Sequence, residues 1–128
     1  MAIVSKTQTE VILYVQNMNS EVHFYQDVLG LSIRYPQGLT NYSDEMWVEF
    51  TLGDTILALH GGAKSQPDDL HEIVFWVIDV AQARADIIKA GYEMGEVRTL
   101  EDSALIAQGM DPAGHRYAIR EAKIDKDE

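Results

Sequence analysis

One strand–helix pattern occurs twice in the chain, and this repeat constrains the fold more than any other feature of the sequence. Residues 10–15 and 72–77 are both rich in β-branched and aromatic side chains, which favour strands. Each run is followed by a helix N-cap residue, by apolar side chains at helical spacing and by a glycine that ends the helix. The matched positions, 61 or 62 residues apart, are Glu10 and Glu72, Asn17 and Asp79, and Gly30 and Gly91. The sequence therefore predicts two copies of one structural unit.

Three more strands complete each copy. They are expected at residues 31–35, 46–51, 55–60, 93–100, 104–110 and 116–121. The order in each copy is thus strand, helix and three strands, or βαβββ. We expect one domain over residues 1–128, with a first unit at about 8–62 and a second at about 70–122, and with a linker within residues 61–69.

Both helices carry readable signals. In the first copy the sequence predicts a single α-helix over residues 18–29. Its apolar stripe consists of Met18, Val22, Tyr25, Val28 and Leu29. In the second copy Gln82 follows Asp79 by three residues, which predicts a capping box with reciprocal hydrogen bonds.

The charge balance excludes several kinds of partner. Lys and Arg number 10 and Asp and Glu number 21, which gives a net charge of −11. Nucleic acids and anionic membrane surfaces need a basic patch, so neither is expected as a partner. Cysteine is absent, which removes disulfides and thiolate nucleophiles. No run approaches the roughly 20 apolar residues of a membrane span. We expect an acidic, cytoplasmic protein whose charge permits a cationic or metal ligand.

Two segments resemble the glyoxalase/bleomycin resistance protein/extradiol dioxygenase (vicinal oxygen chelate, VOC) superfamily. They are residues 24–31, FYQDVLGL, and residues 111–114, DPAG, and the resemblance extends over about residues 8–122. It implies an α+β fold in which two pseudo-symmetric βαβββ units form a curved mixed sheet around an open cup, and it implies a homodimer. This superfamily contains metal-dependent isomerases, lyases, epimerases and dioxygenases, and also drug-binding proteins without catalysis. The fold alone therefore does not name the function.

The metal enzymes of this superfamily place one ligand on each of four strands. The resemblance puts these ligand positions at Glu10, Ala58, Glu72 and Ala118. An alanine methyl group cannot coordinate a metal, so the usual four-residue metal site is incomplete in this chain.

Strand alternation predicts which side chains share the cup face. These are Glu10, Ile12, Tyr14, Ile56, His60, Glu72, Val74, Trp76, Arg116 and Arg120. The opposite faces of the first strand of each copy are apolar and are expected to pack under the helices. Their residues are Val11, Leu13, Val15, Ile73, Phe75 and Val77.

Three hypotheses account for this cup. In the first, which the sequence favours, it binds a small molecule without any cofactor. The arginines would neutralise the glutamates, and the aromatic rings would stack on a flat or cationic ligand. Its ligand-binding residues would be Glu10, Tyr14, His60, Glu72, Trp76, Arg116 and Arg120.

In the second hypothesis the protein is a divergent divalent-metal-dependent lyase, isomerase or dioxygenase. Glu10, Glu72 and His60 would then hold Ni, Mn, Zn or Fe. In the third, the cup is an ion-paired sheet interior that binds no ligand. The sequence assigns no catalytic residue in any of the three.

Overall fold

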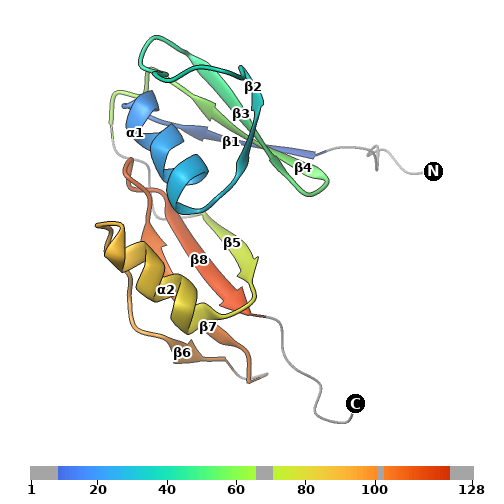
Figure 1. Cartoon of the computed structure of the whole chain (residues 1–128), viewed down its shortest axis with the longest axis vertical. Coiled ribbons are helices and arrows are strands. Elements are labelled where there is room, and N and C mark those ends of the chain that lie inside the picture. The colour runs from blue at the N-terminus through green and yellow to red at the C-terminus, as the bar shows by residue number, and fades with distance from the viewer. Residues whose placement is uncertain (1–8, 66–70, 101–102, 122–128) are drawn as a thin grey trace, which may run out of the picture. The chain divides into compact units, whose positions relative to one another are not determined.

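The computed structural model describes residues 9–65, 71–100 and 103–121. The chain divides into two compact units, Met1–Pro67 and Asp68–Glu128. Each unit follows the order strand, helix and three strands and has a four-stranded sheet of its own (Figure 1). The α+β fold class expected from the repeat is therefore confirmed, with two separate mixed sheets. Parts of the predicted linker and the C-terminal tail lie outside the described residues.

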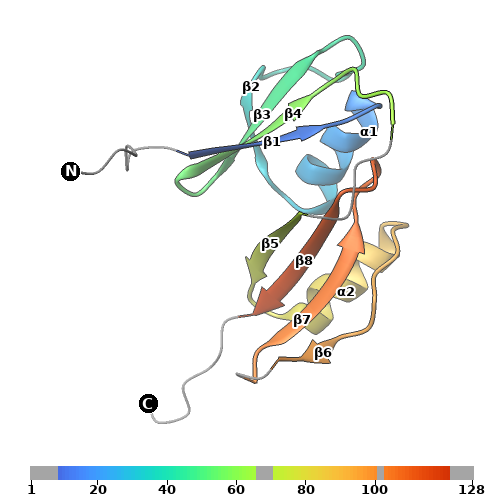
Figure 2. The ribbon, with the colours of Figure 1, turned by 180° about the vertical axis from the view of Figure 1, so that it is seen from behind.

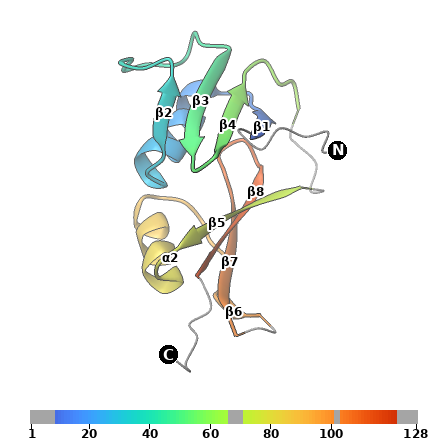
Figure 3. The ribbon, with the colours of Figure 1, turned by 90° about the vertical axis from the view of Figure 1, so that its right-hand side faces the viewer.

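The sheet of the first unit has the strand order β1-β4-β3-β2, and its strands lie side by side in Figure 3. The strands are β1 (Thr9–Tyr14), β2 (Ser32–Tyr35), β3 (Trp47–Leu52) and β4 (Thr55–His60). β1 runs parallel to β4, whereas the β4–β3 and β3–β2 pairs are antiparallel. All four strands agree with the predicted positions to within a residue or so. The strand order makes β1 an edge strand.

The helix of the first unit differs from the prediction in its second half. It begins as α1 (Met18–Val22) and continues as a π-helical turn, η1 (His23–Val28). In that turn the Leu29 N–H donates to the Phe24 carbonyl, five residues back, at 3.0 Å. Phe24 and Tyr25, two adjacent rings, are both fully buried, whereas the predicted stripe contained only Tyr25. The wider π-helical turn occurs where both rings are buried. The predicted single α-helix buried only one of the two, Tyr25.

The second unit repeats the topology with the strand order β5-β8-β7-β6. Its elements are β5 (Glu72–Val77), α2 (Val80–Lys89), β6 (Arg98–Thr99), β7 (Leu105–Met110) and β8 (Arg116–Glu121). β5 is parallel to β8, and the other pairs are antiparallel. The strand expected at 93–100 is much shorter, because only β6 and one bridge between Met94 and Gly109 pair with β7.

Both helix N-caps lie where the sequence predicts them. The side chain of Asn17 accepts a hydrogen bond from the backbone N–H of Ser20 at 3.1 Å. Asp79 accepts one from Gln82 N–H at 3.0 Å. The reciprocal half of the predicted capping box is wrong, because the Gln82 amide donates to the Asp86 carboxylate at 2.9 Å instead. The Gln82 side chain extends one turn further along the helix, where the charged Asp86 acceptor holds its amide group.

In each unit the helix covers one face of the sheet, and the other face carries no helix of that unit (Figure 2). The core on the helix side includes Phe50, Leu57 and Leu59 in the first unit and Tyr117 and Ile119 in the second, all buried. None of the helices in the described part of the chain has the length and apolarity needed to cross a bilayer.

The apolar residues of β1 and β5 are less buried than predicted. Val15 is fully buried, but Val11 is 37% exposed. Phe75 on β5 is only half-buried. Since β1 and β5 are edge strands, their outer sides have no neighbouring strand, and the helix of the unit covers them incompletely.

Candidate ligand-binding faces

The helix-free face of the first sheet, here called the first open face, carries side chains from three strands. Residues that are paired in register point to the same side of a sheet. The face comprises Glu10, Ile12 and Tyr14 of β1, Ile56, Ala58 and His60 of β4, and Trp47, Glu49 and Thr51 of β3. The structure thus puts the three candidates of this unit, Glu10, Tyr14 and His60, on one face.

His60 lies beside two aromatic rings. Its ring centroid is 5.1 Å from that of Tyr14 and 6.0 Å from that of Trp47, with the Trp47 ring edge-on. His60 Nδ1 is 2.7 Å from the carbonyl oxygen of Gly61. A carbonyl oxygen only accepts hydrogen bonds, so Nδ1 carries the hydrogen, and in the neutral tautomer of this ring Nε2 has the lone pair. This histidine can therefore accept a hydrogen bond or bind a metal through Nε2.

Glu49, which the sequence did not single out, holds the centre of this face. It is paired in register with Ala58. Its carboxylate forms an ion pair with Arg34 and accepts a hydrogen bond from Trp47 Nε1 at 2.8 Å. The available signal was the alternation of residues 47–51, in which Val48 and Phe50 are buried and the residues between them are not. Two donors hold this carboxylate in a defined orientation.

The second open face is the helix-free side of the second sheet. It comprises Glu72, Val74 and Trp76 of β5, Arg116, Ala118 and Arg120 of β8, and Ile106, Gln108 and Met110 of β7. All four candidates of this unit, Glu72, Trp76, Arg116 and Arg120, share this face. Arg120 places its guanidinium 4.4 Å from the Trp76 ring centroid, a cation–π contact.

A polar network centred on Gln108 crosses this face. The Gln108 amide nitrogen donates to Glu72 Oε2 at 2.7 Å, and its oxygen accepts from Arg98 Nη2 at 3.0 Å. Arg116 Nη2 is 3.7 Å from the same Glu72 oxygen, close enough for an ion pair but too long for a hydrogen bond. Gln108 and Arg98 were missed by the sequence patterning, because residues 93–110 carried only weak strand signals.

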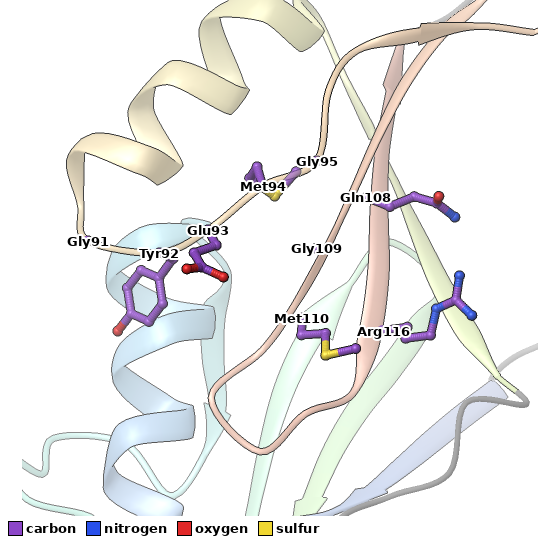
Figure 4. Close-up of a pocket in the computed structure, with 9 residues that line it drawn as sticks. All are labelled: Gly91, Tyr92, Glu93, Met94, Gly95, Gln108, Gly109, Met110 and Arg116. Carbon is purple, nitrogen blue, oxygen red and sulfur yellow. The ribbon is translucent and has the colours of Figure 1, made fainter.

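A pocket of about 830 Å³ lies next to this network (Figure 4). It is lined by residues 91–95, residues 108–110 and Arg116. The lining segment 91–95 is held against β7 by the hydrogen bond from Gly95 N–H to the Gln108 carbonyl, at 2.8 Å. The volume falls in the range of roughly 300–1,000 Å³ that is typical of small-molecule sites. Gln108 and Arg116 belong to both the pocket and the polar network.

Tyr117 packs behind this pocket, on the helix side of the sheet. Its hydroxyl group donates to the Met94 sulfur at 3.1 Å. Burial, with a further contribution from the negative charge of Asp111, raises the pKa of Tyr117 to about 12. The phenol is therefore neutral over the physiological range and serves as a packed donor.

The usual metal site of the resembled superfamily does not fit these residues. Ala58 and Ala118, at two of its four ligand positions, offer no donor atom and are fully buried. Within the described part of either unit, no group of three His, Cys, Asp or Glu side chains could hold a metal ion. Glu10 is level with Ile56, four residues from His60 along β4, which is roughly 13 Å. The set of Glu10, Glu72 and His60 draws on both units and stays a prediction.

Comparison with known proteins agrees with the fold. The family model of the Glyoxalase/Bleomycin resistance protein/Dioxygenase superfamily matches residues 7–119. No curated protein matches the sequence. Among solved structures, the chain is similar to a lactoylglutathione lyase from Agrobacterium tumefaciens, at 19% identity and a TM-score of 0.68, over 89% of this chain and 92% of that one.

Two further structures show the same likeness. The fosfomycin resistance protein FosX from Mesorhizobium loti is 17% identical with a TM-score of 0.68, over 97% of this chain and 96% of that chain. A glyoxalase family protein from Enterococcus faecalis is 18% identical with a TM-score of 0.72, over 88% and 94%. At these identities the likeness concerns the fold alone. The family match over most of the length is decisive: the chain belongs to the Glyoxalase/Bleomycin resistance protein/Dioxygenase superfamily.

Proposed function

We propose that this protein binds a small molecule in the pocket of its second unit, beside the second open face. The observation that carries the proposal is the sharing of Gln108 and Arg116 between the pocket and the polar network. Small-molecule sites combine apolar walls with a few oriented polar groups, and the network supplies that orientation. Tyr92, Met94 and Met110 supply the apolar walls.

The alanines at two metal positions support binding without a cofactor. Ala58 and Ala118 are each paired in register with a polar residue of the neighbouring strand, Glu49 and Gln108 respectively. These polar groups are themselves bound by arginine side chains. At the centre of each open face the polar groups thus bind to other side chains of the same chain. The neighbouring aromatic and cationic groups are the ones left to contact a ligand.

A fragment screen by two-dimensional NMR tests this proposal. Fragments should shift the amide signals of residues 91–95 and 108–110. Met110→Trp would fill the pocket and should weaken binding at least tenfold. Met46→Trp is the matched control, since Met46 is a similarly exposed methionine in the first unit. If no fragment binds, or if binding survives Met110→Trp unchanged, the proposal is wrong.

The alternative is a divergent divalent-metal-dependent lyase, isomerase or dioxygenase. The observation in its favour is the hydrogen bond from His60 Nδ1 to a backbone carbonyl, which orients the ring and makes Nε2 the nitrogen available to a metal in the neutral tautomer. Metal-binding histidines are commonly oriented in this way. Elemental analysis after incubation with Ni, Mn, Zn or Fe tests it. Stoichiometric metal that is lost in His60→Ala, Glu10→Ala or Glu72→Ala would support the alternative, and an absence of bound metal would contradict it.

A further inference from the structure

We propose that the ligand of the second unit is an anion, a small carboxylate with an apolar body, and that Arg116 anchors its carboxylate. This inference rests on the proposed function and specifies its ligand class. The net negative charge of the chain would suggest a cationic ligand instead. The proposal of an anion therefore depends on the local charges, on the hydrogen-bond donors of Arg116 and on the walls of the pocket.

The charge of the second open face is opposite to that of the whole molecule. Three of the five arginines in the chain, Arg98, Arg116 and Arg120, lie on or beside this sheet face. Glu72 is the one acidic residue that the described strand pairing puts on this face, because Glu121 pairs with Val77 on the opposite side. Glu93, an exposed residue of the pocket lining, adds one more negative charge. Three positive charges still exceed two negative ones, in a chain with a net charge of −11. This excess of positive charge on the face favours an anion over a cation.

Arg116 is the arginine best placed to meet a ligand. Arg98 donates to Gln108, and Arg120 stacks on Trp76. Arg116 lines the pocket with a side chain that is 37% exposed. Its neighbour Glu72 takes a 2.7 Å hydrogen bond from Gln108 on the same oxygen that Arg116 approaches only to 3.7 Å. In the described part of the chain this ion pair therefore leaves the guanidinium with hydrogen-bond donors for an external acceptor.

The walls of the pocket suit the rest of such a ligand. Tyr92, Met94 and Met110 contribute one ring and two thioethers, and Figure 4 shows Met110 close to Arg116 at one end. Methionine side chains adapt to varied apolar shapes. A planar carboxylate matches the fork of guanidinium donors, which can bind both of its oxygens at once. Together they favour a carboxylate on an aromatic or aliphatic body.

Paired probes that differ only in charge test the inference. Benzoate and phenylacetate are compared with benzamide and phenylacetamide by NMR titration of the full chain. The carboxylates should bind at least tenfold more tightly than the amides and should shift residues 108–110. Arg116→Gln should abolish this preference, and Arg116→Lys, which keeps the charge but not the fork, should reduce it. Lys89→Gln is the charge-matched control, because Lys89 lies exposed in the last turn of α2.

The outcomes separate this inference from the proposed function. Amides that bind as tightly as carboxylates, or a fragment screen that yields only neutral and cationic ligands, overturn the anion assignment and leave small-molecule binding intact. If neither Arg116 variant changes carboxylate binding, Arg116 is not the residue that anchors the carboxylate. If no probe and no fragment binds the pocket, the proposed function fails as well. Thermal unfolding of each variant shows that a lost preference is not a lost fold, and Arg116→Lys remains decisive if Arg116→Gln does not fold.

Discussion

Gly109 lies where a side chain of any size would push the lining segment 91–95 away from β7. A Cβ atom at this position would be 2.6 Å from the Met94 sulfur and 3.2 Å from both the Glu93 carbonyl oxygen and the Tyr117 hydroxyl. The first contact is with a flexible side chain, but the second is with backbone. At the scale of one residue, therefore, the pocket-lining segment can lie against β7 because position 109 has no side chain.

Gly109→Ala should lower the free energy of unfolding by about 1–3 kcal/mol, the usual cost of overpacking. Urea unfolding measures it. The double variant Met94→Ala/Gly109→Ala should recover part of the loss relative to Met94→Ala alone, because it removes the closest clash. Equal losses in both backgrounds would show that the Met94 contact is not the cause.

The raised pKa of Tyr117 predicts a stability change in alkaline solution. The folded protein holds the phenol proton up to about pH 12, whereas the unfolded chain releases it near pH 10. Stability is therefore unaffected below pH 10 and falls between pH 10 and 12, by about 3 kcal/mol for this group. Urea unfolding across this range should show a steeper loss for the wild type than for Tyr117→Phe. In a pH titration followed by tyrosinate absorbance, the step at the highest pH should be missing from the Tyr117→Phe variant. An unchanged titration curve would show that this step does not belong to Tyr117.

At the scale of elements, the caps show what local sequence can predict. Asn17 and Asp79 cap their helices as expected because the interaction spans only three residues. The π-helical turn and the short β6 could not be predicted from local patterns. They depend on contacts between distant segments, namely the burial of Phe24 and Tyr25 and the hydrogen bond from Gly95 to Gln108.

Asn17→Ala should destabilise the protein by about 1 kcal/mol, because the Ser20 N–H loses its side-chain acceptor. Asn17→Asp, which keeps an acceptor oxygen at the same place, should cost much less. Thermal and urea unfolding of the two variants provide the comparison. A loss as large in Asn17→Asp as in Asn17→Ala would show that the cap hydrogen bond is not what stabilises this helix.

At the scale of the whole molecule, strand alternation predicted which candidate residues share the helix-free side of each sheet but did not reveal their partners. Tyr14 with His60 and Trp76 with Arg120 are neighbours because their strands pair in register. Alternation alone indicates the face on which Glu49 lies, but the positions of Glu49 and Gln108 beside Ala58 and Ala118 depend on strand pairing that neither segment reveals by itself. Net charge was equally uninformative about the site, because arginines concentrate on one face of an acidic chain.

The superfamily resemblance also predicts a homodimer. Light scattering coupled to size exclusion should give about twice the 14.4 kDa mass of the chain. The edge strands β1 and β5 expose Ile12, Tyr14, Val74 and Trp76, apolar surface that a second copy would cover favourably. Ile12→Lys/Val74→Lys should shift the population towards monomer, whereas Ser32→Lys on β2 should not. A monomer at all concentrations would refute the prediction.

The two open faces share one arrangement at equivalent positions of the repeat. Arg34 beside Glu49 in the first unit corresponds to Arg98 beside Gln108 in the second, each next to a buried alanine. The presence of Gln in place of Glu removes a negative charge from the centre of the second face, whereas the first face keeps it. One βαβββ framework thus presents two faces of different charge within a single chain.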